Sequence, residues 1–364
     1  MKNWGNRPWT IDFHATKREL PRSVDFAAVG GGFTGLAASA WLKHFAPQKS
    51  VALFESESFG AGSSGHTGGV VLAETATGDL PGLGDVLAGY QNILKTLDVH
   101  AELSLPGVYE LGRTAPLPNS PIHWDDSGQL CATKAVPGGS IDPGKAVSGL
   151  ARAAERSGVL LFEHAAVDDA TFNQSVELRT NLGIVTAHHV LFATNAFSLE
   201  LTHLDKRAQS AFTLAIATEP LSTSVLAEIG LAERKPFYTV DLPYLWGRLL
   251  GDSVIFGSGL VYAGDWRKLA DIDVTQGQPE DLLALLEKRI HGLHPALHNV
   301  NFTHSWGGPI CIAEGCKPVF EFHRESRNAI ILGAYSGHGV AQSVYLGAWA
   351  AETLLGKREL PSWK

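Results

Sequence analysis

The chain has 364 residues, of which 45% are hydrophobic and 18% are charged, and its formal net charge is −8. This length allows two domains or one interleaved pair, and an acidic balance without a cluster of Lys and Arg argues against nucleic-acid partners. No run of eighteen apolar residues occurs, so we expect no transmembrane helix and no membrane partner.

The first 23 residues contain Trp4 and Trp9 but show no periodicity. They predict an extended arm that packs on the body of the protein through its aromatic side chains. The arm has no apolar stretch of the kind found in signal peptides. Three cysteines do not make a secreted disulfide framework. We therefore expect a cytoplasmic protein.

An apolar run at 26–29 predicts a strand that breaks at a glycine turn and restarts as a helix. Gly30, Gly32 and Gly35 follow the spacing G-x-G-x-x-G. In a dinucleotide-binding turn the first glycine permits the turn, the second lets the backbone approach a pyrophosphate, and the third lets helix and strand pack closely. The pyrophosphate would lie on free N–H groups at the positive end of the helix dipole.

A second apolar run at 51–54 closes a strand–helix–strand unit and places Glu55 at its end. A carboxylate at this position can bind a pair of ribose hydroxyls. The unit therefore predicts adenine-dinucleotide binding, and the alternative is a glycine turn without a ligand.

Residues 55–69, rich in glycine and serine, are expected to form a loop against a flat polar group rather than a helix. At this point the chain resembles the D-amino-acid-oxidase-like flavoprotein superfamily, in which such a loop follows the ribose-binding glutamate and lies over the flavin. The resemblance implies FAD. Besides the three glycines and Glu55, the implied cofactor contacts in the turn and loop are Phe33, Thr34, Ser56, Ser63, Ser64, His66, Thr67 and Gly68.

The pattern after this loop is less clear, with a helix expected near 83–103 and a strand near 108–113. Asp142 followed by proline is a helix start signal and Gly158 is a natural stop, which predicts a helix between them. A strand over 159–167 follows.

The resemblance implies that this helix and strand return the chain to the dinucleotide domain. It implies that Val167 contacts the adenine through its backbone. It also places Ala193 and Thr194, at the end of the next apolar run, near the cofactor. From the residues alone, each of these runs reads as an ordinary buried strand.

Alternating runs and then an amphipathic helix fill the stretch between 205 and 301. The runs are 212–221, 243–250 and 253–262, and the helix is 279–293. This order predicts a mixed sheet that carries a substrate cavity. Most of its aromatic residues should be core, and we expect Tyr244 or Trp246 to face the cavity.

A second glycine turn follows an apolar run at 329–333 and opens a helix. A helix N-terminus at this place would aim N–H groups at the electron-rich edge of the flavin ring. The short sequences YSGHGV and WGG resemble those of γ-glutamylputrescine oxidase-like members of the superfamily. The implied cofactor contacts in this turn are Gly337, His338, Gly339 and Val340.

His338 is expected to line the flavin face, with proton transfer as the alternative role. The candidate catalytic residues are His338, Tyr335, Tyr244 and Trp246. The histidines between 291 and 298 are expected at a solvated helix end, and no metal site is expected.

His66 follows Glu55 by eleven residues, where putrescine-branch members carry an arginine. Dimethylglycine dehydrogenase and its relatives carry at this register the histidine that bonds to the flavin 8α-methyl carbon. An imidazole is a competent nucleophile when its other nitrogen is held. The resemblance thus leaves two alternatives, a covalent flavin tether through His66 or a neutral histidine packed beside the ring.

Amino-acid-oxidising members carry an arginine a few residues after the tryptophan of the WGG word, where its planar fork binds the substrate carboxylate. In this chain Ile310 occupies that place after Trp306. We therefore expect an amine as substrate, or an amino acid bound through another residue such as Arg248. The predicted substrate contacts are Trp306, Ile310 and Arg248.

Together these elements predict an α/β fold: a Rossmann-type FAD-binding domain interleaved with an α+β substrate domain that has a mixed or antiparallel sheet. The FAD-binding domain is expected to comprise residues 1–75, 137–205 and 302–364. The substrate domain is expected to comprise 76–136 and 206–301.

The expected function is FAD-dependent oxidation of an amine, in which a C–H bond beside nitrogen donates hydride to flavin N5 and the imine hydrolyses. Reoxidation by O2 gives hydrogen peroxide, whereas an electron carrier would make the protein a dehydrogenase of an N-methyl or secondary amine. The rivals are oxidation of a C–OH bond, which needs a stronger base, and a noncatalytic flavin-bearing subunit. The amine, the electron acceptor and the number of subunits stay open.

Overall fold

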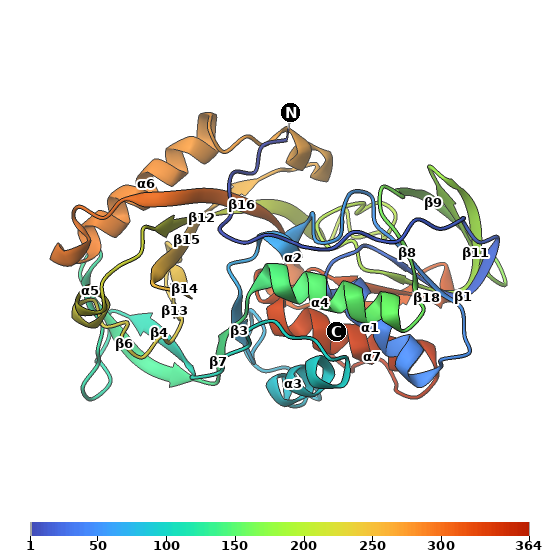
Figure 1. The fold of residues 1–364 in the computed structure, drawn as a ribbon, viewed down its shortest axis with the longest axis horizontal. Helices are drawn as coiled ribbons and strands as arrows, with labels where there is room; N and C mark the ends of the chain where they lie inside the picture. Colours follow the sequence, from blue (N-terminus) through green and yellow to red (C-terminus); the bar gives the residue numbers. More distant parts are fainter. Residues whose placement is uncertain (1, 364) are drawn as a thin grey trace.

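The computed structural model describes residues 2–363, so the outermost residues of the predicted domain ranges, 1 and 364, lie outside this description. Two eight-stranded sheets lie side by side (Figure 1). One is covered by a layer of helices, and the other is mostly antiparallel. The predicted fold class, a parallel α/β unit beside a mixed or antiparallel sheet, is confirmed.

The first sheet has five parallel strands at its centre, in the order β18, β11, β1, β2 and β8. At its margins β17 pairs antiparallel with β18, and β10 pairs antiparallel with β11 and β9. The bounds are β1 Ser23–Val29, β2 Val51–Phe54, β8 Leu160–Phe162, β9 Val167–Phe172, β10 Val176–Thr180, β11 Gly183–Phe192, β17 Val319–His323 and β18 Ser326–Gly333.

Three helices cover one face of this sheet, α1 (Phe33–Phe45), α4 (Pro143–Arg156) and α7 (Gly339–Leu354), and α3 (Val86–Thr96) packs on α7. Alternate strand residues face the two sides, so in β1 Phe26 and Ala28 pack under the helices while Ala27 and Val29 pack on the β9–β10 side. Both faces are thus buried, which explains the near-continuous apolar runs. Across residues 2–363, no helix combines the length and apolar character needed to cross a bilayer.

The second sheet has the order β16, β12, β15, β14, β13, β4, β6 and β5, and only β13 and β4 pair in parallel. The bounds are β4 Val108–Gly112, β5 His123–Asp125, β6 Gln129–Val136, β12 Ala208–Thr218, β13 Phe237–Thr239, β14 Trp246–Leu250, β15 Ser253–Tyr262 and β16 Phe302–Ala313. The predicted amphipathic helix is α6 (Gly277–Leu293), which packs on β12 and β15. The other elements include α5 Thr223–Glu228, the short 3-10 helices Trp266–Asp271, Pro295–Leu297 and Glu314–Cys316, and the two-stranded sheet of β3 Val70–Leu72 and β7 Gly138–Ser140.

The arm at 2–22 crosses from the second sheet to the first without forming a helix (Figure 1). The Trp4 indole donates to the carbonyl of Leu269 at 3.0 Å, and the Trp9 indole donates to the carbonyl of Gly65 at 2.9 Å. Both rings are buried. The two tryptophans therefore hold the arm against both halves of the molecule, as the sequence predicts.

Several predicted elements differ from those observed. The loop expected over 55–69 contains one helical turn, α2 (Ser63–His66), too short to show a hydrophobic period. The strand expected over 159–167 ends at Phe162, because His164 has a φ of 54° and turns the chain before β9.

The helix expected near 83–103 is shorter, because Asp85 caps α3 through the Ala88 N–H at 2.9 Å and Asp98 has a φ of 55° just beyond its end. By contrast, the predicted start of α4 is confirmed. The Asp142 carboxylate accepts from the Lys145 N–H at 2.8 Å, and Pro143 is the first helical residue.

The division into two domains stays a prediction. One strand lies in a different sheet from the one its predicted domain implies. The sequence predicts residues 302–364 in the FAD-binding domain, but β16 pairs along its length with β12 in the second sheet. The chain therefore passes through the second sheet once more before it returns to β17 and β18.

We predict that Gly35→Ala destabilises the protein and Gly292→Ala does not. A Cβ at Gly35 would lie 2.0 Å from the backbone oxygen of Gly30, and this overlap should cost about 1–3 kcal/mol. Gly292, near the end of α6, has open space around its Cβ position, and alanine there should gain roughly 0.5–1 kcal/mol. Urea unfolding measures both changes, and equal midpoints for the two variants would contradict the packing described for α1.

Candidate active site

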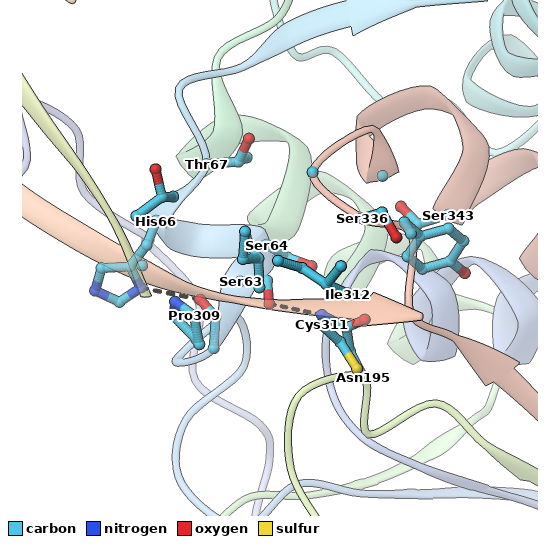
Figure 2. A pocket seen from close by; sticks show the side chains of 18 of the residues that line it. Ser63, Ser64, His66, Thr67, Asn195, Pro309, Cys311, Ile312, Ser336 and Ser343 are labelled. Atoms are coloured by element: carbon cyan, nitrogen blue, oxygen red, sulfur yellow. Dashed lines mark hydrogen bonds between the residues drawn. The ribbon is translucent and has the colours of Figure 1, made fainter. Parts of the chain in front are cut away.

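A cavity of about 1050 Å³ is lined by residues of both sheets. All the predicted site residues line it except Gly35 and Arg248. The wall is built from both glycine turns, from α2 and the two residues that follow it (63–68, called the α2 segment), and from the face of the second sheet that includes β16 (Figure 2). The structure thus brings together residues from both ends of the chain.

The first glycine turn joins β1 to α1. Gly30 has a φ of +110°, a conformation that side-chain-bearing residues rarely adopt. A Cβ on Gly32 would lie 2.8 Å from the Ser64 hydroxyl, which itself accepts from the Phe33 N–H at 2.9 Å. Gly35 packs directly on the carbonyl of Gly30, so it lies behind the cavity wall and serves helix–strand packing.

Glu55, at the end of β2, points back into this turn. Its Oε2 accepts from the Gly31 N–H at 2.7 Å, and its Oε1 accepts from the Glu57 N–H at 2.9 Å and the Ser56 hydroxyl at 3.1 Å. Burial raises the pKa of Glu55. The hydrogen bonds lower it, but by less than burial raises it. The carboxylate is thus held in one orientation at the cavity wall.

Three hydrogen bonds join the first turn and its loop to the second turn, one directly and two through the side chain of Asn195. The Tyr335 hydroxyl lies 2.8 Å from the Thr34 hydroxyl. The Asn195 side chain donates to the Ser63 hydroxyl at 2.9 Å, as Figure 2 shows, and accepts from the Ala334 N–H at 2.9 Å. The predicted convergence of the two turns is therefore a direct contact.

Helices α1 and α7 both begin at the cavity. The residues that precede them, Gly32 and His338, line the cavity, and neither caps its helix with its own side chain, although the Ser64 hydroxyl accepts from the Phe33 N–H at the start of α1. Uncapped N–H groups at a helix start favour an anion or a partial negative charge. The cavity thus offers such a start at each glycine turn, which fits a ligand with a pyrophosphate and an electron-rich ring.

His66 ends α2 and lies against the arm. Its Nδ1 lies 2.9 Å from the carbonyl of Gly62, which can only accept, so Nδ1 carries the proton. The Arg7 guanidinium lies 3.2 Å from Nε2 and donates to it. Burial, and then the charge of Arg7, lower the pKa of His66 to about 3. The imidazole is therefore neutral, and both of its nitrogens have partners within the chain.

His338 lies at the start of α7 and lines the cavity. Its Nδ1 lies 3.3 Å from the carbonyl of Ser336 and donates to it. Burial lowers the pKa of His338. The ring is therefore neutral and its Nε2 keeps a lone pair.

One row of residues crosses the second sheet on the side of the cavity. The aligned neighbours on successive strands are Glu110 (β4), Tyr238 (β13), Trp246 (β14), Gly257 (β15), Ala215 (β12) and Trp306 (β16). Aligned residues point to the same face of a sheet, and all except Gly257 line the cavity. A Cβ on Gly257 would lie 2.0 Å from the Trp246 ring, so glycine leaves room for that ring. At the far end of the row, the Trp306 indole donates to the carbonyl of His66 at 3.0 Å.

The structure does not bring Arg248 to the cavity. Its side chain is 3% exposed, and its guanidinium donates to the carbonyls of Gly68 and Leu249. Burial lowers the pKa of Arg248 to about 10. Arg248 is therefore placed to hold the α2 segment rather than to bind a substrate carboxylate.

Tyr244 lines the mouth of the cavity and is 58% exposed. Its backbone is fixed, because Arg289 donates to the carbonyls of Tyr244 at 3.2 Å and of Pro243 at 3.0 Å. Trp246 lies deeper, against Gly68 and Gly257. Of the two predicted aromatics, Trp246 therefore lies in the wall and Tyr244 at the entrance.

The lining residues that sequence reasoning did not single out include Asn195, Glu74, Glu110 and Tyr238. Asn195 has a φ of 51° directly after Thr194, and a polar residue that tolerates this backbone at the end of a strand was a usable signal. Glu74 and Tyr238 are 164 residues apart and share no motif, so only the fold brings them together.

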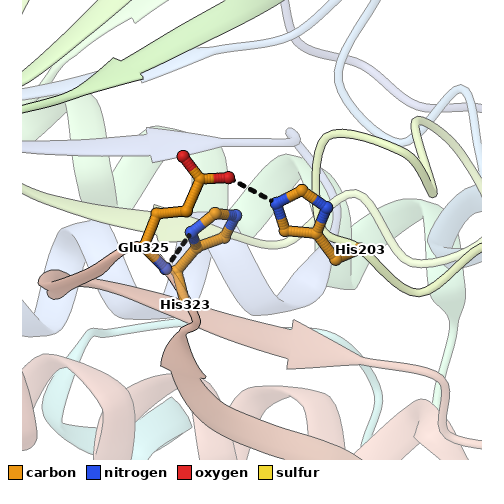
Figure 3. Close-up of side chains that lie close together, drawn as sticks. All are labelled: His203, His323 and Glu325. Atoms are coloured by element: carbon orange, nitrogen blue, oxygen red, sulfur yellow. Dashed lines mark hydrogen bonds and ion pairs between the residues drawn. The ribbon is translucent and has the colours of Figure 1, made fainter.

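A second group of titratable side chains, His203, His323 and Glu325, lies outside this cavity (Figure 3). Glu325 is 2.9 Å from Nε2 of His203. Both ring nitrogens of His323 form hydrogen bonds with backbone groups: Nε2 with the carbonyl of Leu201 and Nδ1 with the N–H of Glu325, each at 3.2 Å. The group thus leaves two side chains free to ligate, whereas a structural zinc takes four ligands. We assign it a structural role, joining the segment around His203 to the β17–β18 hairpin.

A family model described as FAD dependent oxidoreductase, DAO, matches residues 25–353. The chain is similar to the probable oxidoreductase OrdL of Haemophilus influenzae, with 29% identity over 228 residues, which are 61% of this chain and about half, 48%, of that protein. It is 25% identical to the gamma-glutamylputrescine oxidoreductase of Escherichia coli over 93% of this chain and 85% of that protein. The crystal structure of L-proline dehydrogenase from P. horikoshii has the same fold, with a TM-score of 0.72 at 17% identity over 93% and 95% of the two chains.

The buried neutral state of His66 predicts a pH dependence of stability that His66→Gln reduces. The unfolded histidine binds a proton below about pH 6.5, whereas the folded one does so only near pH 3, so its contribution is complete above pH 6.5 and is lost as the pH falls. At pH 5 the loss should be about 2 kcal/mol. Urea unfolding at pH 7.5 and pH 5 measures this loss. An equally steep pH dependence in His66→Gln would contradict it.

Proposed function

Because the chain belongs to the DAO family of FAD-dependent oxidoreductases, we propose that it oxidises the carbon–nitrogen bond of an amine without relying on a substrate carboxylate. FAD, when bound, supplies the two-electron oxidation, and the protein supplies binding, orientation and electrostatics. The name of the similar gamma-glutamylputrescine oxidoreductase supports an amine substrate.

The charge of the cavity wall is the observation that carries this proposal. Among the described residues that line the cavity, the permanent cations are Lys2 and Arg267. Lys2 is paired with Glu57 at 2.6 Å and Arg267 with Glu200 at 2.7 Å. Ile310 lines the wall where an amino-acid oxidase would carry its arginine. A substrate carboxylate would lose its hydration here without gaining a free cation, a cost that an amine avoids.

The residues at the two turns fit FAD. The first turn and the start of α1 hold the pyrophosphate, since Gly32 has no side chain of its own and the Ser64 hydroxyl lies beside it. Glu55 binds the ribose, and Val167 lies at the adenine end of the wall. The turn that opens α7 faces the flavin ring.

His338 contributes a neutral imidazole to this turn, and its Nε2 can accept a proton. A substrate ammonium must lose a proton before its nitrogen lone pair can assist oxidation. Nε2 of His338, at the turn that opens α7, can accept that proton. Lining the flavin without proton transfer is the alternative role.

Anaerobic mixing of the yellow holoenzyme with amines tests the function. We expect primary or secondary amines to remove the absorbance of oxidised flavin faster than simple α-amino acids at the same concentration, because the cavity lacks a free cation. Return of the colour with hydrogen peroxide on admission of O2 would identify an oxidase, and return only with an added carrier would identify a dehydrogenase. A flavin that no amine bleaches would refute the proposal.

We predict that FAD is held without a covalent bond to His66. One nitrogen of the ring donates to Gly62 and the other accepts from Arg7, so no lone pair is free to attack a flavin methyl group. Acid precipitation should leave the yellow colour in the supernatant. Colour that stays with the wild-type polypeptide and is released in His66→Ala would instead support the tether.

A further inference from the structure

Two carboxylates share one phenol at an end of the cavity wall. Tyr238 on β13 and Glu110 on β4 are aligned neighbours in the second sheet, and Glu74 lies just after β3. The Tyr238 hydroxyl lies 2.7 Å from Oε1 of Glu74 and 3.3 Å from Oε2 of Glu110. All three residues line the cavity. The phenol therefore joins acidic groups from two separate parts of the fold.

No buried cation compensates the negative charge of Glu74 and Glu110 among the described residues that line the cavity. A phenol has one proton and donates fully to one acceptor at a time. Burial, and then the bond to Glu74, raise the pKa of Tyr238, so it stays neutral. The Lys134 ammonium lies 4.0 Å from Glu110 but is 63% exposed, where solvent screens an ion pair.

The other carboxylates around the first turn differ in this respect. Glu55 is engaged by backbone N–H groups, and Glu57 is paired with Lys2. The cavity also lacks an unpaired permanent cation among the residues described. Asp168, beside Val167, also lines the cavity but is exposed to solvent, whereas Glu74 and Glu110 are half-buried. The uncompensated negative charge away from solvent therefore concentrates at Glu74 and Glu110.

This acidic end is a short distance from the candidate catalytic residues. Trp246 is the aligned neighbour of Tyr238, and adjacent strands are about 4.8 Å apart, which puts Glu110 about 10 Å from Trp246 along the sheet. On the other side Gln342 of α7 donates to the backbone carbonyl of Glu74 at 2.6 Å, so Glu74 is fixed to the helix that begins at His338. An alkyl chain of a few carbons spans this separation over the Trp246 ring.

We propose that Glu74, Tyr238 and Glu110 bind a second, distal ammonium group of the substrate, which makes the substrate class diamines or amines with a second cationic group. This inference rests on the proposed amine oxidation. An ammonium has three donors and both carboxylates accept, so it can bond to each while Tyr238 keeps one of its bonds. The same pair repels a carboxylate at this end of the substrate.

The test compares straight-chain diamines of three to six carbons with monoamines of equal length. The dissociation constant comes from the concentration dependence of anaerobic flavin bleaching, and from thermal-shift titration for any probe that does not bleach. We expect the wild-type protein to bind the best diamine at least about tenfold more tightly than its monoamine, as a charge-assisted hydrogen bond allows. Glu74→Gln and Glu110→Gln should each reduce that preference about tenfold.

Glu233→Gln is the matched control. Glu233 also accepts from a tyrosine, Tyr109, at 2.9 Å, but it lies outside the cavity wall. The control should keep the wild-type preference. Equal binding of diamines and monoamines by the wild type, or an unchanged preference in both cavity variants, would overturn the subsite while leaving amine oxidation in place. Failure of every amine to bleach the flavin would refute the oxidation itself, and the thermal-shift titration would still decide the subsite.

Discussion

The active cavity depends on the contact between two glycine turns that lie almost a whole chain apart. Thr34 and Tyr335 are separated by 301 residues, yet their hydroxyls are 2.8 Å apart. The turns follow β1 and β18, and β11 runs between these strands, so Asn195 at its end reaches both sides. Because parallel strands end at a common edge, this topology brings two helix N-termini to one cavity. These hydrogen bonds hold the start of α1 beside the start of α7.

Strand register sets the chemistry of the opposite wall. Glu110, Tyr238 and Trp246 share a face because they are aligned across three strands. A shift of one residue in β13 would turn Tyr238 toward the hydrophobic core and bring Phe237 to the cavity. The charge of this wall thus depends on pairing between strands that are far apart in sequence.

Local signals predicted the parts of the fold that local chemistry determines. The glycine spacing from Gly30 and the cap at Asp142 each specify a turn or helix start within a few residues, and both were found where expected. Arg248 shows the limit of this reasoning. Its charge is visible in the sequence, but the buried face of β14 that it occupies and the Gly68 carbonyl that it binds are products of tertiary packing. The partnership of Glu74 with Tyr238 is hidden for the same reason.

The arm has a consequence for how the molecule is assembled. The Asn3 side-chain amide donates to the carboxylate of Asp273, 270 residues later, and the backbone carbonyl of Trp4 accepts from the Gly307 N–H on β16. During synthesis these first residues leave the ribosome long before their docking surface exists. Contacts of such long range form slowly, so the arm is expected to be among the last segments to settle. Trp9 and Arg7 of the arm both donate to the carbonyl of Gly65, so α2 gains these two bonds only when the arm docks.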